Sequence, residues 1–533
     1  RLALLHDRAA SERVALALDS PDPQVRMHAA LCLSACGARP ALDALAKALD
    51  DRHPEVARAA VVALANLTGR LAADQPASSE GEEASAAWRR WLADQSGPRL
   101  EQRLIAQLAA DDPAAVIAAA DALGHVGSPQ AVAPLQDMIR KHLAEESSQC
   151  DVKALMAAMR ALGHLRASEA IPLLGLVLAL DCRQGGALAR RNVHLAATAA
   201  EALGRIGTSQ SEEVLVRFCG KLESFAFYSQ VCGDHPVLRE CHASILHYRI
   251  LEAFDALGTQ RREVLGPLLR SLPGDLDRGL LVENDGYETL LGRVVQRCGL
   301  SHELLQTCLA VLQEPVAPSL GLLREELTSY PTPQLAQRKD IPLDELFRAP
   351  RGGLTFLPYT PVMRSAQMIS VLMLDDRCAA QVVDTFHRYR RQTPDPIGDF
   401  RAARDRAWVC FYLARALGRV RGPAATDALL ACLQEDPPEA ALGRTTPPHP
   451  MSFVAITPFH RAAAAYGLGL SGERRALDVL LRIVSDMDNA LDVRHSAARG
   501  LILAARAGDW PAIRHLAADY PETTIRRMLQ QAP

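Results

Sequence analysis

Aromatic side chains are scarce in this chain: Phe, Trp and Tyr together make up 5% of its 533 residues. Strands favour aromatic and β-branched residues, whereas the alanine and leucine that abound here favour short, closely packed helices. An excess of either charge is missing too, because 59 basic and 62 acidic residues leave a formal net charge of −3. The chain as a whole therefore has no electrostatic attraction for nucleic acid or for an anionic membrane.

Long apolar runs are also missing. No stretch approaches the roughly 18–20 uncharged apolar residues that cross a bilayer, so the sequence predicts no membrane span. At the start of the chain, Leu2 and Leu5 align with Leu33 and Cys36 one repeat later. We therefore expect the chain to begin inside a repeat, with an earlier segment, and any signal peptide in it, missing before Arg1.

The signatures of common enzymes are absent from the sequence. There is no G-x-x-x-x-G-K-[ST] loop for phosphates, no H-E-x-x-H zinc motif, no G-x-S-x-G nucleophile elbow and no C-x-x-C pair. The sequence therefore predicts a non-enzymatic protein without a cofactor.

Of the twelve cysteines, Cys32, Cys36 and Cys432 fall at repeat positions that are apolar elsewhere in the chain. Cys36 aligns with Leu67, and Cys32 aligns with Ala63. Cysteine at such a position behaves as a small apolar residue, and a large repeat protein needs no disulfide framework. We expect buried free thiols and a reducing, cytoplasmic compartment.

An internal repeat of about 31 residues is present, a period typical of helical solenoids. At this offset Val25 falls on Val56, Ala29 on Ala60 and Leu33 on Leu64, and these positions follow helical spacing. Each first helix is expected to end at a leucine-glycine step, and a second amphipathic helix follows. The step recurs at Leu123-Gly124, Leu162-Gly163, Leu203-Gly204, Leu257-Gly258, Leu417-Gly418 and Leu468-Gly469. The pattern predicts an all-α solenoid of about ten or eleven helical pairs.

Three stretches resemble a known repeat family: VRMHAALCLSACG, DPAAVIAAADALGHVGSPQAVAPL and DVRHSAARGL. They resemble HEAT repeats, in particular the short bacterial type of phycobilisome lyases, over most of residues 1–312 and 400–533. The resemblance implies a right-handed superhelical α-solenoid and is uninformative about activity. The arginine of the pattern is present as Arg26 and Arg494 but is replaced by Ala57 and Cys410, so the polar contacts between repeats that it implies are in doubt at the latter two.

Interruptions of the repeat suggest the domain organisation. We expect one array over 1–312 and a second over 362–533, separated by a proline-rich insert at 313–361 that is either a hinge or a segment packed across the inner face. The first array contains an insertion at 70–98, a polar loop followed by a short helix whose Trp88 and Trp91 are expected to pack on the stack. The second contains a long proline-rich loop at 435–459.

The preferred functional hypothesis is a scaffold that binds another protein along the concave face of the solenoid, either alone or as a subunit of a larger complex. Aromatic residues of the insert and of the long loop, and the arginines of a basic run, are the candidate partner-binding residues: Phe356, Tyr359, Phe453, Arg388, Arg390, Arg391, Arg401 and Arg404.

Two alternatives remain open. The resemblance to lyase repeats implies a chromophore chaperone that attaches bilins to a client protein. The arginine run at 388–406 could instead bind nucleic acid, since guanidinium groups beside aromatic rings contact phosphates and bases. Asp395, Asp399 and Asp405 dilute this run, and the negative net charge disfavours nucleic acid further.

A group of cysteines and histidines between residues 219 and 247 contains the ligand types that zinc prefers, with Cys232, His235 and Cys241 as candidate ligands. Cys241 and His242 are adjacent and would point about 100° apart on a helix, so both could not readily turn to one ion. The sequence favours core thiols beside surface histidines and predicts no metal site.

Overall fold

The computed structural model describes residues 8–37, 39–70, 82–95, 98–144, 152–180, 186–219, 236–265, 268, 285–299, 301–313, 361–372, 377–392, 400–420, 422–435 and 460–530. Within these ranges the chain forms α-helices and short 3-10 helices and no strand, so the predicted all-α class is confirmed. No helix in these ranges combines the length and the apolar character needed to traverse a lipid bilayer.

The chain divides into two compact units. Unit 1 comprises Arg1–Lys221 and Tyr228–Gly258, and unit 2 comprises Leu222–Phe227 and Thr259–Pro533. The predicted boundaries of the two arrays remain predictions, because residues 314–360 and 436–459 lie outside the described residues and with them nearly all of the predicted insert and long loop.

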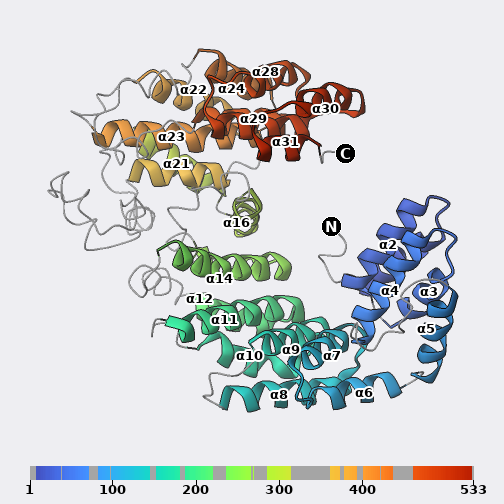
Figure 1. The fold of residues 1–533 in the computed structure, drawn as a ribbon. Coiled ribbons are helices and arrows are strands. Elements are labelled where there is room, and N and C mark those ends of the chain that lie inside the picture. The colour runs from blue at the N-terminus through green and yellow to red at the C-terminus, as the bar shows by residue number, and fades with distance from the viewer. Residues whose placement is uncertain are drawn as a thin grey trace. The chain divides into compact units, whose positions relative to one another are not determined.

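In unit 1 the first helices of successive pairs pack side by side in chain order and form one layer (Figure 1). They are α2 (Pro23–Cys36), α4 (Pro54–Thr68), α7 (Pro113–Val126), α9 (Val152–His164), α11 (Gly186–Ile206) and α14 (Pro236–Leu257). The second helices are α3 (Ala41–Ala48), α6 (Arg99–Gln107), α8 (Val132–Ala144), α10 (Ile171–Leu178) and α12 (Ser209–Cys219). The helices α3, α6, α8 and α10 each pack against the first helix of the following pair, so every repeat depends on its neighbour for burial.

Unit 2 repeats this arrangement. Its first helices include α21 (Pro361–Leu372), α23 (Phe400–Arg419), α27 (His460–Ser471), α29 (Leu491–Ala504) and α31 (Thr523–Gln530), each packed on the next. Its second helices include α22 (Ala379–Arg390), α24 (Pro423–Glu435), α28 (Arg474–Ser485) and α30 (Trp510–Ala518). A preceding pair, α16 (Asp285–Arg297) and α17 (Ser301–Gln313), packs against α21.

The start of a first helix is encoded by an aspartate followed by a proline. Asp22 caps α2, where the backbone N–H of Gln24 donates to its carboxylate at 2.9 Å, and Asp112 caps α7 in the same way through Ala114 at 3.0 Å. The following proline has no N–H that would need a partner in the first turn, and its fixed φ suits a helix. The repeated Asp-Pro step therefore sets where these helices begin.

The core contains the aligned leucines. Leu33, Leu64 and Leu123 are fully buried, as the repeat predicts. The thiols described by the structure are free, and all but the half-buried Cys32 are buried. Burial raises the pKa of the Cys308 thiol to about 12. These cysteines therefore contribute to packing as small apolar groups.

The glycine of the leucine-glycine step does not end the helix in most repeats. α7 continues through Gly124 to Val126, and α11 continues through Gly204 to Ile206. A Cβ on Gly124 would lie 2.9 Å from the Cα of Ala161, and one on Gly204 only 2.6 Å from the Cα of Ala253. The prediction of a helix stop is therefore wrong at these positions: the missing side chain lets neighbouring first helices approach closely. At Gly258, with a φ of 66°, the glycine does follow the last residue of α14.

The tryptophans of the predicted 70–98 insertion pack within unit 1. They lie on α5 (Glu82–Asp94), and Trp88 is buried. The guanidinium of Arg70 lies 4.9 Å from the ring centroid of Trp88 and 5.0 Å from that of Trp91, and Arg103 of α6 lies 4.8 Å from Trp91. These cation–π contacts attach α5 to the stack.

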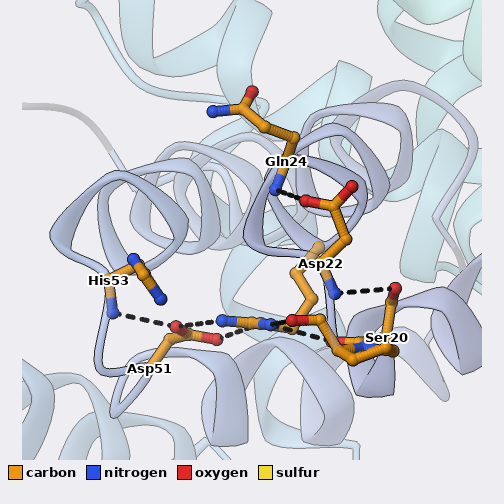
Figure 2. Close-up of polar contacts among 7 residues, drawn as sticks. Ser20, Asp22, Gln24, Asp51 and His53 are labelled. Atoms are coloured by element: carbon orange, nitrogen blue, oxygen red, sulfur yellow. Dashed lines mark hydrogen bonds and ion pairs between the residues drawn. The ribbon is translucent and has the colours of Figure 1, made fainter.

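The buried arginine of the repeat pattern joins one repeat to the next through Asp51, which Figure 2 shows with a dashed line to the backbone of His53. Arg26 of α2 donates two hydrogen bonds to the carboxylate of Asp51, which precedes α4, at 2.6 and 2.8 Å. The guanidinium also donates to the carbonyl of Ser20, and the backbone N–H of His53 donates to Asp51. The inter-repeat contact that the resemblance implied is therefore present at Arg26.

The same forward contact recurs in unit 2. Arg461, which aligns with Arg26 but was not recognised in the sequence, donates to the side chain of Asn489 at 3.0 Å. Arg494 donates to the hydroxyl of Tyr520 at 3.0 Å. In each case an arginine near the start of a first helix contacts the segment before the next first helix.

Replacing Asp51 by asparagine should lower the thermal unfolding midpoint of unit 1 at neutral pH. It should also make the fall of this midpoint with decreasing pH less steep. The hydrogen bond from Arg26 holds the pKa of Asp51 below its ordinary value of 3.8. A carboxylate with a depressed pKa in the folded state stabilises the fold above that ordinary value, and this stabilisation is lost as the pH falls through the lowered pKa. Unfolding followed by circular dichroism between about pH 7 and about pH 2 measures the effect.

The matched control is Asp43→Asn on the exposed surface of α3. This substitution should change neither the midpoint at neutral pH nor its fall with decreasing pH. The prediction would be contradicted if the unfolding midpoints of Asp51→Asn and of the unsubstituted protein fell equally steeply with decreasing pH.

Candidate functional site

A row of charged and histidine side chains crosses the first-helix layer of unit 1. On α7, α9 and α11, one member precedes the glycine of the leucine-glycine step by three residues and a second follows it directly; α14 adds two more. We call this row the charged ladder. Its members are Asp121, His125, Arg160, His164, Glu201, Arg205, Arg249 and Glu252.

At the start of the charged ladder, an ion pair joins α7 and α9. The guanidinium of Arg160 lies 3.6 Å from the carboxylate of Asp121. Desolvation by the surrounding protein is the largest influence on the carboxyl group and raises the pKa of Asp121, against the attraction of Arg160. The pair is accessible to water nevertheless, because 34% of the arginine and 42% of the aspartate side chain are exposed.

A denser ion-pair network joins α11 and α14. Glu201 contacts Arg205 at 2.6 Å on its own helix and Arg249 at 3.7 Å on the next. Arg249 also pairs with Glu252 at 2.6 Å. Desolvation, the largest influence, lowers the pKa of Arg205, although 22% of its side chain is exposed. This network therefore reaches solvent while the neighbouring helices partly desolvate its charges.

Two histidines connect these ion pairs. The rings of His125 and His164 lie 5.1 Å apart between centroids. Nδ1 of His125 lies 3.2 Å from the carbonyl oxygen of Gly37, and the guanidinium of Arg205 contacts Nε2 of His164. The charged ladder is therefore continuous from the α7 repeat to the α14 repeat.

Towards the start of unit 1 the same repeat position becomes apolar. Leu31 of α2 and Val62 of α4 align with Asp121, and 43% and 49% of these side chains are exposed. The face that carries ions on α7 to α11 thus carries exposed aliphatic groups on α2 and α4. Such adjacent apolar and charged areas are typical of protein-binding surfaces.

Sequence reasoning missed the charged ladder, although a signal exists. His125, His164 and Arg205 each follow the glycine of the repeat, so aligning the repeats places them in one column. The ion pairs between helices join residues far apart in the chain, Asp121 with Arg160 and Glu201 with Arg249, and form only when the helices are stacked.

Several arginines of the predicted basic run donate hydrogen bonds to backbone carbonyls within unit 2. Arg388 donates to the carbonyl of Leu312 at 2.9 Å, and the buried Arg390 donates to the carbonyl of Ala431 at 3.2 Å. Arg406 donates to the carbonyl of Arg390 at 2.9 Å. Arg391 is exposed at the end of α22. These bonds to carbonyls near helix ends stabilise the helix termini.

The remaining candidates lie where the structure describes no side chain. Arg401 and Arg404 lie on α23 and Cys241 on α14, but their side chains are outside the described set, as are all of Cys232, His235, Phe356, Tyr359 and Phe453. Their roles stay predictions. Among the side chains that the structure does describe, no group of three or more potential metal ligands occurs.

Comparison with known proteins identifies the repeat. The family of HEAT repeats matches residues 10–78, and the PBS lyase HEAT-like repeat matches residues 115–140 and 409–435. No curated protein matches the chain in sequence. A crystal structure of importin beta in an ammonium sulfate condition aligns with 98% of this chain and 73% of its own length, at 14% identity and a TM-score of 0.23. A similarity of that size carries no argument about this chain.

The family matches coincide with the helical pairs. Residues 10–78 include α2, α3 and α4, residues 115–140 include most of α7 and α8, and residues 409–435 include the end of α23 and all of α24. The sequence matches, the stacked pairs and the arginine contacts between repeats all agree. The chain contains HEAT repeats at these positions.

Proposed function

We propose that this HEAT-repeat chain is a non-enzymatic scaffold that binds another protein across the charged ladder of unit 1. The observation that carries the proposal is the balance of the ladder, which presents as many carboxylates as guanidinium groups in alternation along the layer. A partner with one sign of charge, such as nucleic acid, would meet like charges as often as opposite ones. A protein surface can place charges of both signs in register with the ladder.

The order of the ladder supports binding. Arg160, Glu201 and Arg249 are held by ion pairs before any partner arrives, so less side-chain entropy is lost on association. Their partial exposure leaves hydrogen-bonding capacity directed to solvent. The exposed Leu31 and Val62 offer apolar area on the same layer.

The compartment remains part of the proposal. The free thiols that the structure describes support the expectation of a reducing, cytoplasmic environment, because disulfides are rare there.

Removing two guanidinium groups from the ladder should abolish partner binding without unfolding the chain. In Arg160→Ala with Arg249→Ala, we expect affinity purification from the native source to lose the stoichiometric partner that the unsubstituted chain recovers, with a drop in affinity of at least about tenfold. Circular dichroism checks that both chains are equally folded.

The charge-matched control removes two arginines from second helices: Arg140 on α8 and Arg217 on α12, whose side chains are 55% and 74% exposed. Arg140→Ala with Arg217→Ala should retain the partner. Equal retention by both double variants would exclude the charged ladder as the binding surface, and recovery of the unsubstituted chain alone would count against the scaffold function.

A further inference from the structure

His164 is in contact with a cation inside the charged ladder. Nη1 of Arg205 meets Nε2 of its ring. A guanidinium group has no acceptor, so the contact is a hydrogen bond only when Nε2 of His164 carries a lone pair. The ring is then neutral, with its proton on Nδ1.

The packing around the ring leaves it little freedom to turn away. His125 lies against it from α7, with 5.1 Å between the ring centroids. A Cβ on Gly124 would be 3.1 Å from Nδ1 of His164, so the absence of a side chain at Gly124 makes the space that the ring occupies. His125 and the backbone at Gly124 therefore block rotation of the half-buried His164 ring towards α7.

The charged groups around His164 come from four helices and are already engaged with one another. α7 contributes Asp121, which pairs with Arg160 of α9. α11 contributes Glu201 beside Arg205, and α14 contributes Arg249 and Glu252. After desolvation, the nearby Arg249 and Arg160 add to the lowering of the Arg205 pKa, while Glu201 and Glu252 oppose it. Because desolvation already disfavours the charge of Arg205, a second positive charge on the imidazole in contact with it is unfavourable.

We propose that the contact between His164 of α9 and Arg205 of α11 is acid-sensitive. The neutral ring of His164 accepts a hydrogen bond from Arg205, and protonation of the ring replaces this bond by repulsion and weakens the packing of the two repeats. An imidazole titrates near pH 6.5 in water, so the change falls in mildly acidic conditions. The inference concerns the fold of unit 1 and does not depend on a bound partner.

Carboxylates do not produce the same response. Burial raises the pKa of Asp121, so its own titration makes the folded state bind protons more readily and favours folding as the pH falls. Asp51, whose pKa is lowered, loses its stabilising effect only below its ordinary value of 3.8. A loss of stability between about pH 7 and about pH 5.5 in this part of the chain therefore reports on histidine.

Hydrogen exchange of the full chain, read by mass spectrometry at about pH 7.5 and about pH 5.5, tests the proposal. After correction for intrinsic exchange rates, the opening equilibrium of peptides from α9 and α11 should rise by up to about tenfold for each pH unit below about 6.5. His164→Gln keeps an acceptor for Arg205 but does not titrate, so this dependence should disappear in the variant.

His28→Gln provides the control, because His28 is exposed on α2 and bonds only within its own helix, to the carbonyl of Gln24. It should keep the pH response of α9 and α11. The measured quantity is the change of the opening equilibrium with pH rather than its absolute value. A general destabilisation by His164→Gln therefore does not obscure the result. An equal slope in His164→Gln and the unsubstituted chain, or no slope in either, overturns the proposal.

Discussion

Replacing Leu123 by alanine is expected to lower the free energy of unfolding of unit 1 by about 2–5 kcal/mol. Leu123 lies on α7 and is fully buried, so the truncation removes apolar contacts and leaves a cavity. α7 packs against α4, α6 and α9, and each of these contacts joins neighbouring repeats. Denaturant unfolding followed by circular dichroism measures the loss.

The loss should be local before it becomes global. In a repeat array each pair is stabilised mainly by its neighbours, so hydrogen exchange should accelerate first in α7 and the helices that touch it. The matched control is Leu176→Ala on α10, where 68% of the side chain is exposed and little burial is lost. A single two-state melt of the whole chain, with uniform exchange in Leu123→Ala, would contradict the prediction.

Adding one methyl group at Gly469 should destabilise unit 2 by about 2–3 kcal/mol. A Cβ at this position would lie 2.3 Å from the Cα of Gly500 and 2.6 Å from its carbonyl oxygen. Both are backbone atoms, so no side chain can move aside, and α27 and α29 must separate. Alanine is favoured over glycine within a helix by up to about 1 kcal/mol, so a measured loss identifies the close approach of the helices.

Gly508→Ala is the control within the same unit. Gly508 is exposed, and a Cβ there meets no atom within 4 Å. Thermal unfolding of the two variants should show a lowered midpoint for Gly469→Ala and an unchanged one for Gly508→Ala. A midpoint raised by Gly469→Ala would mean that helix propensity outweighs the close packing and that α27 and α29 are not in contact at this point.

Much of the fold could be predicted from short stretches of sequence. Leu33 and Leu64 recur at one position of the repeat with helical spacing, and both are fully buried. Asp22 followed by Pro23 marks the start of α2, because the cap and the ring geometry act within one turn. Such signals are readable because the interactions behind them involve residues close together in the chain.

The glycines show where local reading fails. Gly124 and Gly204 have the form of a helix stop, since glycine is common after the last helical residue. Their role depends instead on Ala161 and Ala253, which belong to the next first helix and lie far along the chain. Nothing within the helix itself distinguishes a glycine that ends it from one that admits a neighbour.

The candidate site was hidden for the same reason. A count of charges drew attention to Arg388 and Arg390, but their guanidinium groups donate to carbonyls of α17 and α24. In the charged ladder, His164 and Arg205 are ordinary polar residues when read singly. Their significance arises from stacking, which brings an acceptor on one repeat to a donor on the next.

The sequence by itself determined that this protein is built from paired helices of the HEAT type, because periodicity, capping and turn residues act over one or two helical turns. Only the tertiary structure decided which glycines admit a neighbouring backbone and which polar side chains meet across repeats. Both outcomes depend on the register in which successive helices stack, and that register is set by the complementary surfaces of two helices rather than by the residues of either one.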